Sequence, residues 1–170
     1  MLTDLAEIRR LGEKKREENQ RLRRHMKVHD FPERRLRRVA EEIEEQIDCT
    51  LCANCCKLAS VRLQERDVEK LARRFRMTAA RFRAEYAEAS AEEGLILRRT
   101  PAGCVFLEGT LCAVYEDRPD TCRHFPHLVR GAGSLVSRMW RMPDRACYCP
   151  IVYNTLEEYK RVLGFGARGR

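Results

Sequence analysis

The feature that most constrains this chain is a run of four cysteines within eight residues. The run reads Cys49-Thr-Leu-Cys52-Ala-Asn-Cys55-Cys56. A C-x2-C spacing lets two thiolates reach one ion or cluster and frees backbone N–H groups to bond sulfur, whereas ordinary core packing gives no reason to concentrate thiols in this way. Cys49, Cys52 and Cys55 also reproduce the first three positions of a bacterial ferredoxin run, without the fourth cysteine three residues further on. The run therefore predicts a metal site.

The chain of 170 residues carries nine cysteines, an odd number. Met1 to Arg10 lacks the apolar segment of a signal peptide, and no stretch approaches the roughly 18 to 20 apolar residues of a membrane helix. We therefore expect a cytoplasmic protein without a membrane anchor. Cytosolic thiols stay reduced, and a complete set of disulfides would need an even number. Metal thiolates are the favoured interpretation, and structural disulfides are the alternative.

A second set of cysteines is spread over the later part of the chain. Folding can bring this set to the first, which gives eight candidate ligands and enough thiols for two four-ligand sites. Cys55 and Cys56 are adjacent, so their side chains leave the backbone in different directions and we expect them to serve different metals or roles. Cys147 is the odd thiol, and it is a half-buried free cysteine, a resolving partner or a substitute ligand. The eight candidate ligands are Cys49, Cys52, Cys55, Cys56, Cys104, Cys112, Cys122 and Cys149.

Several side chains near Cys122 can act on the thiolates from outside the ligand set. Arg118 and Arg123 can lower the pKa of nearby thiolates and offset the negative charge of an all-thiolate site, or each can pair with a surface glutamate. Either His124 or His127 can complete a mixed cysteine and histidine zinc site, although a lone histidine more often serves as a hydrogen-bonding residue. The candidates for the surroundings of the ligands are Tyr115, Arg118, Arg123 and His127.

Charged residues make up 35% of the chain, with a formal net charge of +8. A basic surface raises non-specific affinity for nucleic acid or anionic lipid. Here, however, basic residues are interleaved with glutamates, and there is no basic patch interleaved with the aromatic rings on which single-strand binders stack bases. We therefore expect an unidentified protein, such as a redox partner, in preference to nucleic acid.

Hydrophobic periodicity predicts helices in the first third of the chain. Residues 4–28 read as one long charged helix, and its middle, Gly12 to Arg21, has no apolar face. That middle is either solvated or leans on a partner or a second copy of the chain, which leaves homo-oligomerisation through this helix open. Asp30 and Glu33 form a capping box, with Pro32 in the first turn of a second helix. The apolar stripe of this second helix is Leu36, Val39, Ala40, Ile43 and Ile47.

The remaining pattern predicts a mainly helical α+β fold in a single small domain, with a short β-hairpin and cysteine-rich loops that form the metal site. We divide the chain into an N-terminal charged helix (1–30), a cysteine-cluster metal-binding domain (31–163) and a flexible tail (164–170). Thr78 is a plausible N-cap. The predicted helices cover residues 63–75, 78–87, 134–141 and 151–163, and the predicted strands cover residues 94–97, 105–107 and 111–113.

Three motifs taken together are similar to one known family. They are Cys49-x2-Cys52-x2-Cys55-Cys56, then Cys104-Val-Phe-Leu, then Cys112-Ala-Val-Tyr115-Glu-Asp-Arg118-Pro119-Asp-Thr-Cys122-Arg123-His-Phe125-Pro126. They resemble the YkgJ-like cysteine-cluster family of zinc- or iron-chelating domains, from roughly Ile8 to Tyr159. The resemblance implies that the eight candidate cysteines chelate metal. The family usually has Cys-Pro at the position of Cys104-Val105, and Cys147 is an addition, but neither departure removes a ligand.

The residues and the resemblance leave three functions open. The leading hypothesis is an iron–sulfur protein, with a 4Fe–4S cluster favoured, in electron transfer or redox chemistry. The alternative is a zinc-structured module that binds protein or nucleic acid. Some members of the family that the chain resembles are labelled iron–sulfur oxidoreductases or are related to flagellin lysine methylases. Protein lysine methylation is therefore a third hypothesis, although no Gly-rich nucleotide loop follows a strand. Whether the chain is an enzyme stays open.

Overall fold

The computed structural model describes residues 1–29 and 31–166, which form two compact units. The first unit combines residues 1–48 with the chain from residue 126 onward, and the second is Cys49–Phe125. Most of the described residues are helical, and the described strands form short antiparallel pairs. The predicted mainly helical α+β fold is therefore confirmed. Within the described ranges, no helix is long and apolar enough to cross a membrane.

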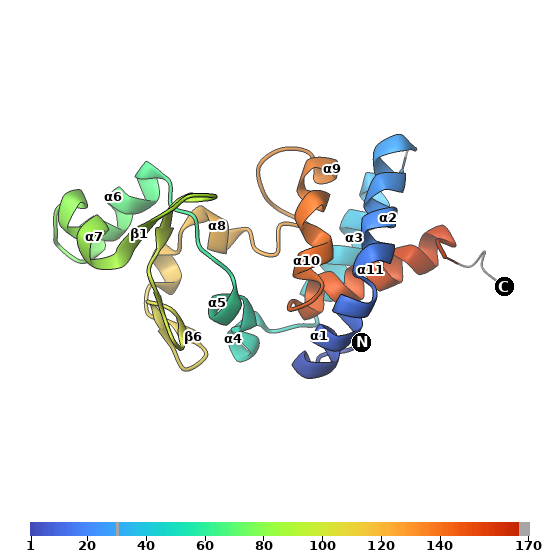
Figure 1. Ribbon diagram of the computed structural model, residues 1–170, viewed down its shortest axis with the longest axis horizontal. Helices are drawn as coiled ribbons and strands as arrows, with labels where there is room; N and C mark the ends of the chain where they lie inside the picture. Colours follow the sequence, from blue (N-terminus) through green and yellow to red (C-terminus); the bar gives the residue numbers. More distant parts are fainter. Residues whose placement is uncertain (30, 167–170) are drawn as a thin grey trace. The chain divides into compact units, whose positions relative to one another are not determined.

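The described part of the first unit is built from helices, and α3 packs along α11 (Figure 1). Each helix turns aliphatic side chains inward, and a fully buried leucine or methionine contributes about 1.5 to 3 kcal/mol by leaving water. Side chains that are almost wholly buried include Ile8, Leu22, Leu36, Met142 and Leu156. The elements are α1 (Leu5–Lys14), α2 (Arg16–Val28), α3 (Glu33–Glu44), α9 (Leu135–Arg138), the 3-10 helix η2 (Met139–Arg141), α10 (Met142–Arg145) and α11 (Pro150–Leu163).

The N-terminal segment forms two helices where one was predicted. The backbone leaves helical geometry at Lys15, whose ammonium pairs with Glu157 of α11. The middle of this segment was predicted to lack an apolar face and to be solvated or to contact a partner; most of it is exposed or half-buried, but Gly12 and Asn19 are buried. Gly12 allows close packing, because a Cβ at this position would lie 2.5 Å from the carbonyl oxygen of Ala146. A small residue, not an apolar stripe, lets this part of the helix pack.

The apolar stripe of the second predicted helix is buried as expected except at its end, where Ile47 lies beyond α3 and is half-buried. Leu36, Val39, Ala40 and Ile43 of α3 all lie in the core. Pro32 occupies the position before the first helical residue. The predicted capping box depends on Asp30, which lies outside the described residues.

The second unit contains short helices and three antiparallel strand pairs, β1 with β2, β3 with β4 and β5 with β6. Thr78 caps α7 as predicted, because its hydroxyl accepts a hydrogen bond from the Arg81 N–H. The elements are α4 (Cys49–Cys52), α5 (Asn54–Leu58), α6 (Glu65–Arg74), α7 (Ala79–Tyr86), β1 (Ala87–Ser90), β2 (Gly94–Leu97), β3 (Arg99–Thr100), β4 (Gly103–Cys104), β5 (Leu107–Glu108), β6 (Leu111–Cys112), the 3-10 helix η1 (Tyr115–Asp117) and α8 (Asp120–Arg123).

An aromatic cluster lies in the core of the second unit, among buried aliphatic side chains. The rings of Phe75, Phe82, Tyr86 and Phe106 stack on one another, with centroids 5.2 Å apart for Phe75 and Tyr86. Phe106 lies between the cysteines Cys104 and Cys112 in sequence, so its burial anchors the hairpin region on the core. This packing positions the cysteine-bearing loops.

Candidate metal centre

The first cysteine run folds into two helical turns, α4 and α5, joined at Ala53. Ala53 is buried and has a left-handed backbone, with φ of 47°. A residue with a Cβ pays about 1 kcal/mol or more for this conformation, so the surrounding packing must hold it in place. The N–H of Ala53 bonds to the Cys49 carbonyl, and the N–H of Lys57 bonds to the Ala53 carbonyl. The turn at Ala53 therefore sets the relative orientation of the two halves of the run.

Gly103 brings the second set of cysteines against the first. Its φ is 129°, a conformation that favours glycine, and a Cβ here would lie 2.6 Å from the carbonyl oxygen of Cys56. From the adjoining strand, the Arg99 guanidinium donates to the carbonyl oxygens of Lys57 and Ala59, at 2.5 and 2.7 Å. These bonds satisfy carbonyl groups at the end of α5, which lack partners within that helix. Gly103 and Arg99 together place Cys104 beside Cys56.

Cys104 and Cys112 belong to the hairpin region that follows. Cys112 pairs with Leu107 across β5 and β6, and the turn between these strands is Gly109-Thr110, which confirms the predicted hairpin. The backbone N–H of Phe106 bonds to the Cys104 sulfur, and that of Val114 bonds to the Cys112 sulfur. In both cases the donor follows the cysteine by two residues. Donors of this kind stabilise thiolates that bind a metal.

Cys122 lies on α8, whose position depends on α6. The buried Asp67 carboxylate accepts from the N–H of Gln64 at 3.0 Å and from the N–H of Asp120 at 3.1 Å, so one side chain serves the N-termini of both helices. The ammonium of Lys70 donates to the Arg118 carbonyl at 2.8 Å. One helix thereby orients the segment that carries Cys122.

Sequence reasoning treated residues 63–75 as scaffold and missed these contacts. Arg74 belongs to the same set, because it donates to the Ala113 carbonyl at 2.9 Å and pairs with Asp117 at 2.8 Å. The available signal was spacing, since Asp67, Lys70 and Arg74 recur at i, i+3 and i+7 on one helix face. That spacing indicates a shared face, but it does not say what the face contacts.

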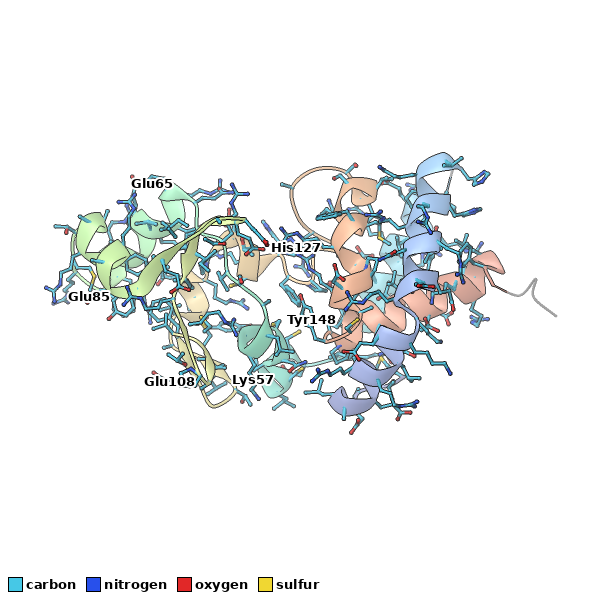
Figure 2. The ribbon with its side chains drawn as sticks, viewed as in Figure 1. Lys57, Glu65, Glu85, Glu108, His127 and Tyr148 are labelled. Atoms are coloured by element: carbon cyan, nitrogen blue, oxygen red, sulfur yellow. The ribbon has the colours of Figure 1, made fainter. Side chains whose placement is uncertain are left out.

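These elements enclose a cavity of about 130 Å³ that lies wholly within the second unit. Its walls include apolar side chains such as Val61, Leu97 and Phe106, and Arg118 is the charged residue among them. Leu111 and Tyr115 also line it and are largely exposed. Figure 2 shows the exposed side chains of Lys57 on α5 and Glu108 on the hairpin. The cysteines that line this cavity, which we call the cysteine cavity, are Cys49, Cys55, Cys56, Cys104, Cys112 and Cys122.

Cys56 differs electrostatically from the other thiols of the cavity. A hydrogen bond with Cys55 and, to a smaller extent, the positive charge of Arg118 together lower the pKa of the Cys56 thiol to about 7, against the opposing effect of burial. A thiol with this pKa is substantially ionised at neutral pH. Cys56 is therefore more readily ionised, and better prepared to bind a cation, than Cys104, Cys112 or Cys122.

Burial raises the pKa of Cys104, Cys112 and Cys122 above the usual value for a thiol. In each case the negative charge of Cys56 raises the pKa further. Four thiols that influence one another in this way lie close together, and they resist simultaneous ionisation unless a cation compensates them. The arrangement thus suits a metal that replaces protons on thiols.

Other candidate residues lie elsewhere. Cys52 is half-buried and does not line the cavity. Cys149 and His127 belong to the first unit, where Cys149 is buried directly before α11 and the His127 carbonyl accepts from Arg138. Cys147, also in that unit, is buried with its sulfur 3.6 Å from an Arg16 nitrogen. Across the residues that the structure describes, no three histidine, cysteine or acidic side chains are grouped so that they could hold a single ion.

The residues expected to surround the ligands behave differently from one another. Arg118 lines the cavity and lies over the Tyr115 ring. Arg123 donates to the Glu116 carbonyl at 2.7 Å and does not line the cavity. The structure thus brings Tyr115 and Arg118 to the cavity, and it directs the Arg123 guanidinium to a neighbouring backbone group.

Comparison with protein families matches residues 48–150 to the CxxCxxCC family, described as a putative zinc- or iron-chelating domain. This match covers more than half of the chain. The chain belongs to the CxxCxxCC family. The predicted resemblance is therefore confirmed, and metal chelation is supported as the role of the domain. Searches of curated proteins and of solved structures found no match.

Proposed function

We propose that the cysteine cavity holds an iron–sulfur cluster of the 4Fe–4S type and that the protein serves in electron transfer or redox chemistry. The observation that carries this proposal is the single cavity lined by six cysteines. The thiols surround a space, and the walls of that space are largely apolar. Both properties match the needs of a cluster, which occupies volume and is tuned by its degree of exposure to water.

The volume favours a cluster over a single zinc ion. Zinc binds four thiolates tetrahedrally at about 2.3 Å, which places the sulfurs within about 4 Å of one another and leaves no internal space. The cysteine cavity measures about 130 Å³, well above the roughly 10 to 15 Å³ that a cavity needs to hold one water molecule. A space equivalent to several water molecules can accept a core of four irons and four sulfides.

Four of the lining cysteines are the proposed ligands. Cys56, Cys104, Cys112 and Cys122 influence one another electrostatically, and two of them receive backbone N–H bonds at sulfur. Donors to sulfur stabilise the added electron of a reduced cluster and raise its potential. When bound, such a cluster supplies one-electron transfer, and the protein contributes ligation, donors and exclusion of water.

We further propose that the partner is a redox protein that approaches the exposed side of the cysteine cavity. Leu111 and Tyr115 line the cavity and are exposed to 63% and 44%. Electron-transfer complexes are often small and short-lived, so a limited apolar rim is sufficient.

The direct test is anaerobic purification of the full chain, with iron, zinc and acid-labile sulfide measured per chain beside the visible spectrum. We expect about four irons and four sulfides with broad brown absorbance. Cys122→Ser should lose that absorbance. Cys147→Ser, in the first unit, is the matched control and should keep it. Zinc without iron or sulfide in the anaerobic protein would overturn the proposal and make the cysteines a zinc site.

A further inference from the structure

Arg118 is held in place at three points. Its guanidinium carbon lies 3.6 Å from the centroid of the Tyr115 ring, within the range of a cation–π contact. Its Nε donates to the Tyr115 carbonyl oxygen at 2.9 Å, and its own carbonyl accepts from the Lys70 ammonium at 2.8 Å. A planar guanidinium fixed by a ring and a backbone acceptor loses much of the freedom that a surface arginine keeps. Its charge therefore has a defined position.

That position is on the wall of the cysteine cavity. The charge of Arg118 acts on several thiols. It lowers the pKa of Cys112 and Cys122, against the effect of burial, and it helps to lower the pKa of Cys56. These are three of the four proposed ligands. Arg118 thus carries a positive charge where the negative charge of the site accumulates.

The other arginines near the thiols are committed differently. The Arg99 guanidinium bonds two carbonyl groups at the end of α5 and so ties strands to helix. Arg74 pairs with the Asp117 carboxylate, which offsets its charge. Arg118, by contrast, forms no ion pair with a carboxylate among the described residues. Arg99 forms no ion pair among the described residues either, but it does not line the cavity. Arg118 is therefore the arginine whose uncompensated charge lies on the cavity wall.

We propose that Arg118, steadied by Tyr115, is the residue that compensates the negative charge of the thiolate site and thereby sets the reduction potential of the bound cluster. This inference rests on the proposed function. A cluster with four thiolates is negative overall, and reduction adds one more negative charge. A fixed cation on the wall of a low-dielectric cavity stabilises the reduced form more than the oxidised form, so its removal lowers the potential.

The test is a redox titration of the full chain, loaded with cluster and followed by visible absorbance, in Arg118→Gln, Arg118→Lys and wild type. We expect Arg118→Gln to lower the reduction equilibrium constant about tenfold, which is about 59 mV for one electron. Arg118→Lys keeps the charge and should recover most of the shift. Arg66→Gln is the matched control, because it removes an exposed arginine that pairs with Asp120 and does not line the cavity. Its potential should stay close to that of wild type.

Each result is read beside iron and sulfide content. An Arg118→Gln protein with full cluster content and the wild-type potential would overturn this inference and leave the proposed function intact. If Arg118→Gln takes up no cluster, Arg118→Lys decides. An Arg118→Lys protein with normal cluster content and the wild-type potential would support the role of the positive charge. An Arg118→Lys protein that also takes up no cluster would show that the arginine side chain has a structural role instead. A wild-type protein without iron would instead defeat the proposed function.

Discussion

The two compact units of this chain are stabilised in different ways. The first buries a core of aliphatic side chains between helices, and it contains two of the nine cysteines, Cys147 and Cys149. The second has a core of aliphatic and aromatic side chains around Phe82, and it holds the other seven cysteines, six of them around one cavity. Packed side chains stabilise a fold by themselves, whereas a space lined by thiols adds stability only when a metal group fills it. We therefore expect the two units to respond differently to loss of metal.

The largest expected effect comes from removal of that metal group. Chelation of the metal should lower the stability of the second unit by several kcal/mol, because binding free energy of a structural metal group adds to folding free energy. Hydrogen exchange should then show lost protection in α5 and α8, while α3 and α11 of the first unit stay protected. Equal loss of protection in α3 and α11 would break the comparison, because it would show that the stability of the first unit also depends on the metal.

A second test uses the glycine that joins the two cysteine sets. Gly103→Ala places a Cβ 2.6 Å from the Cys56 carbonyl oxygen, at a backbone φ that disfavours any side chain. We expect a loss of about 3 kcal/mol in unfolding free energy, measured by denaturant titration, together with reduced metal content.

Gly109→Ala is the matched control for Gly103. Its φ is also positive, but a Cβ there meets nothing within 4 Å. The cost should be about 1 kcal/mol, with normal metal content. Equal losses in the two variants would mean that the close contact with Cys56 is unimportant.

The pH dependence of the first unit provides a third test. Burial raises the pKa of Tyr159 to about 12, and its hydroxyl has no hydrogen-bond partner among the described residues. Tyr159 ionises near pH 10 in the unfolded chain and near pH 12 in the folded chain. Its contribution to the free energy of unfolding is therefore complete below pH 10 and is lost as the pH rises toward 12. The loss should reach about 2 kcal/mol.

Thermal unfolding between pH 9 and 12, followed by the circular dichroism signal of the helices, would measure this loss of stability. Tyr159→Phe removes the titrating group and should flatten the alkaline fall, without a penalty at neutral pH. A fall of the same size in the phenylalanine variant would assign the alkaline loss to other groups.

The smallest expected effect is at Asp67, which serves two helix N-termini in the second unit. Asp67→Asn keeps one acceptor oxygen and removes the charge, so one of the bonds to the N–H groups of Gln64 and Asp120 is weakened. We expect a loss of about 1 kcal/mol, the usual worth of an N-cap. Lower metal affinity at unchanged iron stoichiometry would show that α6 orients Cys122. Unchanged affinity would limit Asp67 to helix stability.

The extent to which sequence predicted this structure depends on the range of the interactions involved. The stripe of α3 and the Thr78 cap were predicted because they depend on residues a few positions apart. The break at Lys15 was missed, since it accompanies a contact with Glu157 far along the chain. The pairing of β3 with β4 was also missed, because each strand has two residues and carries no alternating pattern. Asp67, Lys70 and Arg74 were visible as polar residues on a helix, but their targets were not.

The sequence by itself identified the candidate ligands, because the capacity of a thiol to bind metal is a property of residue type and a C-x2-C spacing works through a local turn. It also identified the family and most of the helices. The tertiary structure decided which thiols share one cavity. That grouping requires Gly103 to pack against Cys56, the aromatic core to anchor Phe106 and α6 to position Cys122. Such contacts join distant parts of the chain, and only folding brings them together.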